Sequence, residues 1–314
     1  MATACVLLKL AKRSLNTRTM GNVGAQTTLP CCDALCRIHT GRFFQGFECF
    51  GIADTAIQRV TVVLHLASLG AAVLAADRDF GKATEFGEEL TADSVDAEIR
   101  QLGGRAVTFS GDLSDALQAR AMVRQCTETL GAPDILVNNA GGVIAPMDRS
   151  APTEVPEDDV RRLFDVNYMT MLHCCQAAGL AMKQRGSGAI VNMSSCAARF
   201  ILPGGRGASY GAFKAAVSHY SRSLALELAP ADVRVNSIAP SIILTSRILA
   251  LAQERGIGRP EAVHEVPLGR YGTPQDVAFV VEFLVTELSQ YVTGQSISVC
   301  GGKHLKPAWE LETP

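Results

Sequence analysis

The stretch Ile190-Val191-Asn192-Met193-Ser194-Ser195, followed after a glycine-rich loop by Tyr210-Gly211-Ala212-Phe213-Lys214, decides how the chain is interpreted. The apolar run that ends in two serines predicts a buried strand with hydroxyl groups at its carboxyl end. Tyr210 and Lys214 are four residues apart in a segment that favours a helix, so both side chains would lie on one face of that helix. This stretch therefore holds the candidate chemistry of the chain.

The spacing of Tyr210 and Lys214 suits proton transfer near neutral pH. A phenol with an unperturbed pKa of about 10 is a poor base unless a cation stabilises the phenolate, and Lys214 would be that cation. The Ser195 hydroxyl would then hold a carbonyl or alcohol oxygen beside Tyr210 while a hydride leaves or reaches the carbon. The same spacing also fits a half-buried ring beside a solvated lysine, which is common on helices.

With Asn167, in Phe164-Asp165-Val166-Asn167-Tyr168, these residues resemble the Ser, Tyr-x-x-x-Lys and Asn tetrad of the classical short-chain dehydrogenase/reductase family. The resemblance implies that Tyr210 is the acid/base, that Lys214 lowers its pKa and that Ser195 orients the substrate oxygen. Asn167 would hold a water that completes the proton relay. Ser195 matches better than Ser194 because it closes the strand, and its longer gap to Tyr210 implies a small insertion at 200–206.

The segment around residue 77 predicts how a dinucleotide would be recognised. A helix ends at Gly70, and the buried strand 72–76 leads to Asp77. An acidic residue there hydrogen-bonds the adenosine ribose hydroxyls and repels a 2′-phosphate, which favours NAD over NADP. Arg78 follows and would instead face a 2′-phosphate, and Asp77 would also serve as a helix cap.

The family resemblance extends to further cofactor-binding positions. Asp112 follows a third strand at 106–109 and matches the position that contacts adenine, although it fits a helix N-cap equally well. Asn139, Ala140 and Gly141 belong to an Asn-Asn-Ala-Gly motif after a fourth strand, and in the family its small residues admit the cofactor ribose. Buried asparagines need partners, which makes this motif specific.

The C-terminal part of the chain continues the family pattern. Pro240 ends a sixth strand, and Thr245 matches the threonine that bonds the nicotinamide carboxamide, although Ser241 replaces the usual glycine between them. Residues 248–265 align with the variable substrate lid and identify no substrate. In relatives the last helix and strand pack against another subunit, which implies a homo-oligomer, a dimer or a tetramer. Cys300 replaces the usual aspartate before two glycines.

The family's glycine-rich phosphate loop is missing from its expected place, a dozen residues before Gly70, where the chain reads Thr55-Ala56-Ile57-Gln58-Arg59. Glycine is needed because the backbone must turn tightly and approach the pyrophosphate. Three explanations remain open. In the first, residues 1 to about 60 replace the original strand and loop and compromise the enzyme. In the second, glycines 41, 46 and 51 form an unusual loop that still binds NAD. In the third, the chain is a catalytically silent partner subunit.

Composition and charge narrow the fold and the partners of this 314-residue chain. An apolar fraction of 47% and a net charge of −2 suit a globular protein and indicate neither nucleic-acid nor membrane binding. We expect a doubly wound, mostly parallel α/β sheet with helices on both faces, formed by residues 51–314, and a small-molecule alcohol or ketone as substrate. The ten cysteines are expected to be reduced thiols, and their spacing predicts no metal site.

Residues 1–50 are expected to form an N-terminal extension. They contain five of the ten cysteines and six basic residues against Asp33 and Glu48. This composition fits a transit peptide with residues 6–13 as its amphipathic start, and it fits a disordered sequence without a targeting signal equally well. The chain is accordingly expected in the cytoplasm, or in mitochondria if the extension is a transit peptide.

Overall fold

A computed structural model describes residues 5–10, 58–80, 92, 94–144, 147–245, 248–249 and 263–305 of the chain. Its centre is one seven-stranded sheet with the order β3-β2-β1-β4-β5-β6-β7. The strands are β1 (Cys5–Leu10), β2 (Ala71–Asp77), β3 (Ala106–Ser110), β4 (Ile135–Asn138), β5 (Gly188–Met193), β6 (Val233–Pro240) and β7 (Ser296–Val299). All neighbouring strands are parallel except at β1, which is antiparallel to both β2 and β4.

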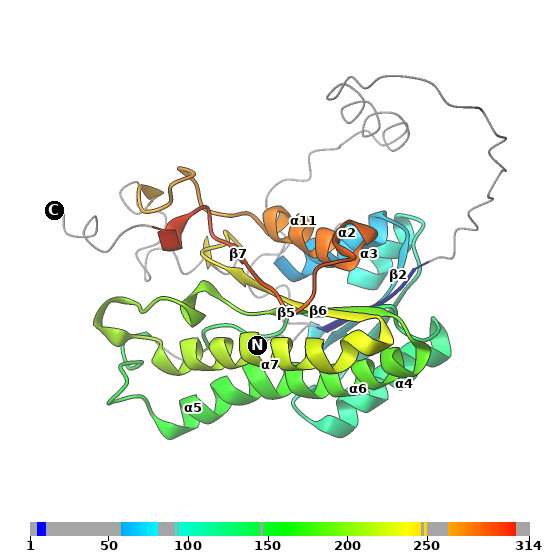
Figure 1. The fold of residues 1–314 in the computed structure, drawn as a ribbon, viewed down its shortest axis with the longest axis horizontal. Helices are drawn as coiled ribbons and strands as arrows, with labels where there is room; N and C mark the ends of the chain where they lie inside the picture. Colours follow the sequence, from blue (N-terminus) through cyan, green and yellow to red (C-terminus); the bar gives the residue numbers. More distant parts are fainter. Residues whose placement is uncertain are drawn as a thin grey trace, which may run out of the picture. The chain divides into compact units, whose positions relative to one another are not determined.

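Helices cover both faces of this sheet (Figure 1). One face carries α2 (Gln58–Ser68), α3 (Val95–Gln101) and α11 (Pro274–Val285). The other face carries α4 (Ala116–Thr129), α6 (Thr170–Arg185) and α7 (Ala208–Leu228). A further helix, α5 (Glu157–Phe164), runs through the π-helical turn η2 (Asp165–Met169) into α6. The predicted doubly wound, mostly parallel sheet is confirmed.

The strands read as apolar runs because their side chains are buried on both faces of the sheet. In β5, Ile190 packs into the core beneath α4, α6 and α7, whereas the next residue, Val191, packs into the core beneath α2 and α11. The same alternation applies to β2, whose seven residues are all buried. The core of the domain therefore consists of two apolar layers, one on each side of the sheet.

The N-terminal strand β1 fills the middle of the sheet. Val6 and Leu8 point into the layer beneath α2 and α11, and Cys5 and Leu7 point into the opposite layer. Each of these four side chains is at most 1% exposed. The segment is thus a central strand whose side chains alternate between two cores, and its interpretation as the start of a transit peptide stays a prediction.

Lys9 explains why this strand is difficult to recognise in the sequence. It is the only charged residue of β1, and its Nζ donates to Ala132 O at 3.1 Å and approaches Asp134 Oδ1 to 3.4 Å. Arg185 also pairs with Asp134, at 2.7 Å. The long lysine side chain thus reaches out of the apolar layer to a carboxylate in the loop before β4.

The direction of β1 separates its carboxyl end from the carboxyl ends of its neighbours. Leu10 pairs with Ala71 at the start of β2, and Cys5 pairs with Ala76 at the end of β2. A phosphate loop that directly followed this strand would thus lie at the opposite edge from Asp77. The strand also comes from within residues 1–50, so the sheet includes a piece of the predicted extension. Glycines 41, 46 and 51 lie outside the described residues.

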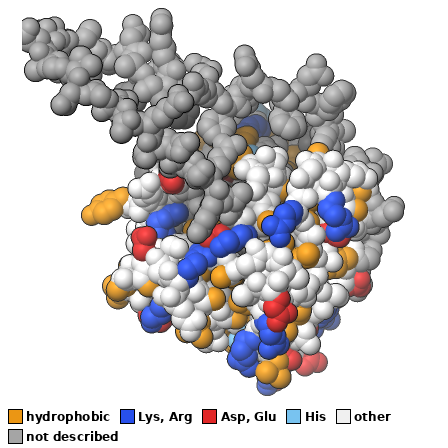
Figure 2. All heavy atoms as spheres, turned by 90° about the vertical axis from the view of Figure 1, so that its right-hand side faces the viewer, with side chains coloured by type: hydrophobic (Ala, Val, Ile, Leu, Met, Phe, Trp, Pro, Cys, Tyr) orange, Lys and Arg blue, Asp and Glu red, His pale blue; other side chains and the backbone are white. Residues whose placement is uncertain are grey.

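One face of the molecule shows the distribution of its charged side chains. On the side of the molecule that carries β2 and β3, Lys and Arg side chains are interspersed with Asp, Glu and hydrophobic side chains (Figure 2). None of the helices in the described ranges has the length and apolar character needed to cross a membrane.

Candidate active site

The carboxyl ends of the parallel strands bring the predicted site residues to one edge of the sheet. Open α/β sheets bind ligands at this edge, beyond the strand ends. Two of the predicted residues, Asp77 and Pro240, end a strand. The others follow a strand within three positions: Asp112, Asn139, Ala140, Gly141 and Ser195. The fold thus collects predicted residues that are far apart in the sequence.

Helix α7 contributes the tyrosine and the lysine. It begins at Ala208, so Tyr210 lies in its first turn and Lys214 one turn further on. Lys214 is only 3% exposed, its Nζ donates to Met193 O at 2.8 Å, and this nitrogen lies 5.9 Å from the centroid of the Tyr210 ring. A buried ammonium is costly unless it is hydrogen-bonded. The contact with the last residue of β5 therefore fixes the charge beside the tyrosine.

The fourth predicted residue, Asn167, lies in the π-helical turn η2. Its Nδ2 donates to Gly142 O at 3.1 Å and to Leu163 O at 3.0 Å, and its Oδ1 accepts from Gly142 N at 2.9 Å. A β-carbon at Gly141 would lie 2.4 Å from Asn167 Oδ1 and 2.9 Å from Lys214 Nζ. Gly141 thus allows the motif after β4, Asn167 and Lys214 to meet at one point.

The two serines after β5 differ in their environment. Ser194 is buried, and its Oγ donates to Lys214 O at 2.8 Å and lies 2.7 Å from Ser218 Oγ, so it ties β5 to α7. Ser195 is partly exposed, and its Oγ accepts from Ala197 N at 3.2 Å as the cap of the short helix η3 (Cys196–Ala198). The preference for Ser195 as the substrate-facing serine stays a prediction, and the accessible hydroxyl supports it.

Two contacts that the sequence does not reveal hold the serine loop in place. A β-carbon at Gly211 would lie 2.7 Å from Ala197 O, so glycine is needed for α7 to approach the loop after Ser195. Arg199 donates from Nη1 to Ser298 Oγ at 2.6 Å and from Nη2 to Ser296 O at 2.6 Å. The arginine contacts a strand about a hundred residues away, and no local pattern could have identified this role.

At the end of β2, Asp77 and Arg78 have different surroundings. Asp77 is 6% exposed and accepts from Asp79 N at 2.9 Å. The Arg78 guanidinium lies 3.4 Å from Asp112 Oδ2. Partial burial opposes ionisation of Asp112, but hydrogen bonds from Ser114 and Arg78 outweigh it and hold the pKa of that carboxyl below its usual value. The Arg78 guanidinium is thus already paired with a carboxylate.

The described residues fit the nicotinamide half and the adenosine ribose of a dinucleotide. Asn139 Nδ2 is buried and has no hydrogen-bond partner within the described part of the chain, so it is a donor ready for a ligand. Asp77 offers a carboxylate for ribose hydroxyls, and Gly141 keeps space beside Lys214. Thr245 caps the turn at Ile248 N, with its Oγ1 3.3 Å away. Residues 11–57, which lie between β1 and α2, and residues 250–262 of the predicted lid lie outside the described residues.

The described part of the chain also contains a cavity of about 400 Å³. It lies between the loop after Ser195 and the start of α7, and its lining is mostly apolar, including Ala197, Phe200, Leu202 and Ala212. Its lining residues on α7, Ala208, Gly211, Ala212 and Ala215, share one face of the helix, whereas Tyr210 and Lys214 lie on another, and none of the four predicted tetrad residues lines the cavity. An apolar ligand surface would be accommodated there.

Comparison with known proteins agrees with this geometry. The family model described as enoyl-(acyl carrier protein) reductase matches residues 61–304, which is more than half of the chain. Cyclohexanol dehydrogenase from Rhodococcus sp. (strain TK6) is 39% identical over 242 residues, which cover 76% of this chain and 89% of that protein. The matched region begins within α2, so β1 lies outside the family model.

Solved structures resemble the fold at a similar level. A 7α-hydroxysteroid dehydrogenase in complex with NADH and 7-oxo glycochenodeoxycholic acid aligns with a TM-score of 0.67 and 32% identity, covering 79% of this chain and 90% of its own. A gluconate 5-dehydrogenase from Burkholderia cenocepacia, in complex with NADP and tartrate, aligns with a TM-score of 0.69 and 28% identity, covering 80% and 92%.

Proposed function

The chain belongs to the short-chain dehydrogenase/reductase family, and from this premise we propose that it transfers a hydride between a nicotinamide cofactor and a secondary alcohol or ketone on an apolar ring. Its activity as an NAD(P)-dependent oxidoreductase of CH–OH groups follows from its relatives, which include cyclohexanol and hydroxysteroid dehydrogenases, and a catalytically silent partner subunit is not favoured. The ring-bearing substrate, the residue roles and the preferred cofactor are proposals.

The observation that carries the proposal is the buried Lys214 ammonium beside the Tyr210 ring. When bound, the nicotinamide supplies or accepts the hydride. Tyr210 would donate or accept the proton at the substrate oxygen, and Lys214 would stabilise the phenolate. Ser195 would donate a hydrogen bond to the same oxygen, and Asn167 would complete the path of the proton to solvent. Asn139, Ala140, Gly141, Pro240 and Thr245 would hold the nicotinamide and its ribose, and Asp112 would contact the adenine.

The proposed substrate class rests on the relatives. The names of two relatives, cyclohexanol dehydrogenase and 7α-hydroxysteroid dehydrogenase, refer to alcohols on saturated rings. A screen of cyclic alcohols against linear polyols at equal concentration tests this choice, and higher kcat/KM for polyols would contradict it.

The two serines offer a matched pair for testing the proposed roles. Ser195→Ala is expected to lower kcat by about 10²-fold, because a hydrogen bond to the reacting oxygen is lost, and to cost about 0.5–1 kcal/mol of stability, because the cap of η3 is lost. Ser194→Ala is expected to cost roughly 1–2 kcal/mol of stability, because its two buried hydrogen bonds to α7 are lost. Steady-state kinetics and urea unfolding of both variants measure these effects, and a loss of kcat confined to Ser194→Ala would reverse the assignment.

We propose NAD as the preferred cofactor. The carboxylate of Asp77 would repel a 2′-phosphate, and Asp112 already engages Arg78. Asp77→Asn keeps the size of the side chain and removes its charge, so we expect the affinity for NADPH relative to NADH to rise by about tenfold. Titration of both cofactors measures the ratio, with Asp148→Asn, on an exposed turn, as the control. An unchanged ratio in Asp77→Asn would contradict this role.

We also propose a homo-oligomer, a dimer or a tetramer, assembled through α11 and the segment that leads to β7. Support comes from large apolar side chains that remain exposed there, Phe279, Leu288 and Tyr291. Light scattering of the purified chain measures the assembly. A cytoplasmic location is our proposal as well, because removal of a transit peptide that includes residues 6–13 would also remove β1 from the middle of the sheet.

A further inference from the structure

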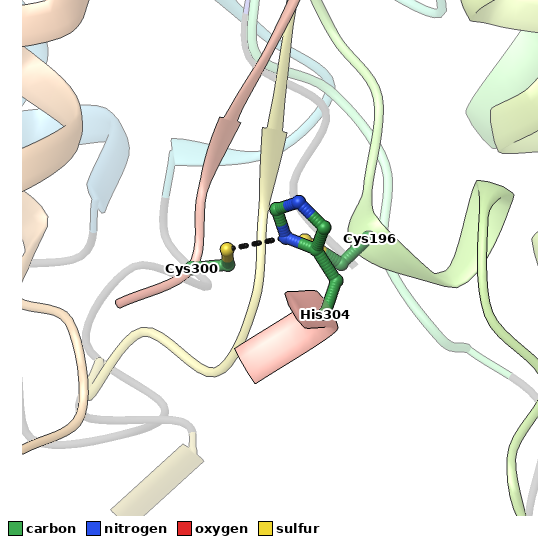
Figure 3. Close-up of side chains that lie close together, drawn as sticks. All are labelled: Cys196, Cys300 and His304. Atoms are coloured by element: carbon green, nitrogen blue, oxygen red, sulfur yellow. Dashed lines mark hydrogen bonds between the residues drawn. The ribbon is translucent and has the colours of Figure 1, made fainter. Parts of the chain in front are cut away.

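Two cysteines and a histidine from two separate parts of the chain meet at the carboxyl edge of the sheet (Figure 3). Cys196 opens η3 after β5, Cys300 follows β7, and His304 lies in the short helix η7 (Lys303–Leu305). Their ligand atoms all lie within 4.8 Å of one another, and no other group of three Cys, His, Asp or Glu residues in the described ranges meets this criterion. The sequence predicts no metal site, because Cys196 is about a hundred residues from the other two.

Local structure holds this cluster together. His304 Nδ1 and Cys300 Sγ are 2.8 Å apart, as the dashed line in Figure 3 marks. The chain turns between them at Gly301 and Gly302, which have φ angles of +59° and +85°, a region that favours glycine. Lys303 pairs with Glu265 at 2.8 Å and anchors η7. The turn therefore aims the imidazole back at the thiol.

The third side chain, Cys196, reaches the cluster from the loop that follows β5. It is 1% exposed, and its Sγ donates to Ala239 O at 3.1 Å. Burial and the neighbouring Cys300 thiol raise the pKa of this thiol. A bound metal ion displaces the proton of a coordinating thiol outright. Burial of Cys196 is thus compatible with coordination, which would release protons.

The donor set selects among metal ions. Two thiols and one imidazole suit a borderline-soft ion that accepts sulfur and nitrogen in a tetrahedral arrangement, and they do not suit Mg²⁺ or Ca²⁺, which prefer oxygen ligands. Three protein ligands would leave a fourth position, and His304 is exposed, so water and the ion would reach the cluster from that side.

We propose that Cys196, Cys300 and His304 form a Zn²⁺ site beside the predicted active site. An ion there would join the loop that carries Ser195 to the segment after β7, which Arg199 already links through Ser296 and Ser298. Because its ligand Cys196 directly follows Ser195, the ion would restrain the loop that carries Ser195. The proposal requires no step of the hydride-transfer reaction to pass through the metal.

Cobalt absorption tests the proposal without measuring activity. The full-length chain, reduced with a phosphine and freed of metal, is titrated with Co²⁺ and then with Zn²⁺. We expect one Co²⁺ per chain with thiolate-to-cobalt charge-transfer absorption and the intense visible bands of a tetrahedral site. Zn²⁺ would remove these bands, whereas Mg²⁺ would not. Because residues 1–50 contain further cysteines, the titration is repeated with four of them replaced by serine: Cys31, Cys32, Cys36 and Cys49.

Variants of the ligands locate the site. Cys300→Ser and His304→Gln are expected to weaken Co²⁺ binding by at least about tenfold, because loss of a direct ligand should cost no less than loss of a group that orients one. His219→Gln is the matched control, because His219 is an exposed histidine on α7, outside the cluster. This variant should bind Co²⁺ as the unmodified chain does. Circular dichroism checks that each variant is folded, and the exposed position of His304 makes His304→Gln informative even if Cys300→Ser unfolds.

Three results would overturn the proposal. The first is unchanged tetrahedral cobalt absorption in His304→Gln. The second is loss of that absorption in the chain with the four N-terminal serine replacements, which would assign the metal to residues 1–50. The third is the absence of cobalt binding by the folded, reduced chain. If peptide mapping of the oxidised protein then joined Cys196 to Cys300, the cluster would be a disulfide pair instead of a metal site.

Discussion

Tyr210→Phe is expected to lower kcat by about 10³-fold or more while leaving the fold unchanged. Phenylalanine preserves the ring that lies 5.9 Å from Lys214 Nζ, so packing in the first turn of α7 is retained. What is lost is the hydroxyl that would exchange a proton with the substrate oxygen. Initial rates with a cyclic secondary alcohol, together with circular dichroism and thermal unfolding, measure both parts of the expectation.

The control for this substitution is Tyr291→Phe. Tyr291 is fully exposed, with a relative accessibility of 104%, and it lies outside the predicted site. The same hydroxyl is removed there, so kcat should stay within a factor of about two. If Tyr210→Phe retained most of the activity, Tyr210 would not be the acid/base, and the proton would have to come from another group at this edge of the sheet.

Leu8→Ala is expected to destabilise the chain by about 2–5 kcal/mol. Leu8 is fully buried in the centre of β1, in the apolar layer beneath α2 and α11. Shortening this side chain leaves a cavity in the middle of the sheet. Because β1 is paired with a strand on each side, the surrounding structure has little freedom to collapse into that cavity. Urea unfolding followed by circular dichroism gives the change in the free energy of unfolding.

An exposed leucine provides the comparison for Leu8. Leu226 is 82% exposed on α7, so Leu226→Ala should change stability by no more than about 0.5 kcal/mol. If Leu8→Ala were as mild as Leu226→Ala, residues 5–10 would not occupy the core of the sheet. The pair therefore tests whether the N-terminal strand completes the domain.

Most of the fold could be predicted because the strands after α2 have strong signals. The apolar runs that lead to Asp77, Asn138 and Ser194 are buried on both faces and end in polar residues, as parallel strands of a doubly wound sheet do. The spacing of Tyr210 and Lys214 placed both on α7 beside the end of β5. Each of these patterns involves residues that are close together in the sequence, so each can be recognised in a single sequence.

The N-terminal strand could not be predicted for two physical reasons. Its apolar run is short and includes Lys9, whose charge is stabilised by Asp134, a residue more than a hundred positions away. An antiparallel and a parallel strand also satisfy the same number of backbone hydrogen bonds, so the sequence of residues 5–10 does not state the direction of the strand. The metal ligands Cys196, Cys300 and His304 escaped prediction for a related reason, since only the fold brings them together.

Titration calorimetry with NADH and NADPH tests most directly whether this edge of the sheet is a nicotinamide site despite the missing glycine-rich motif. We expect one NADH per chain, with saturation in the micromolar to submillimolar range, and weaker binding of NADPH. Absence of binding for both cofactors up to millimolar concentration, by a chain that circular dichroism shows to be folded, would contradict hydride transfer at this site.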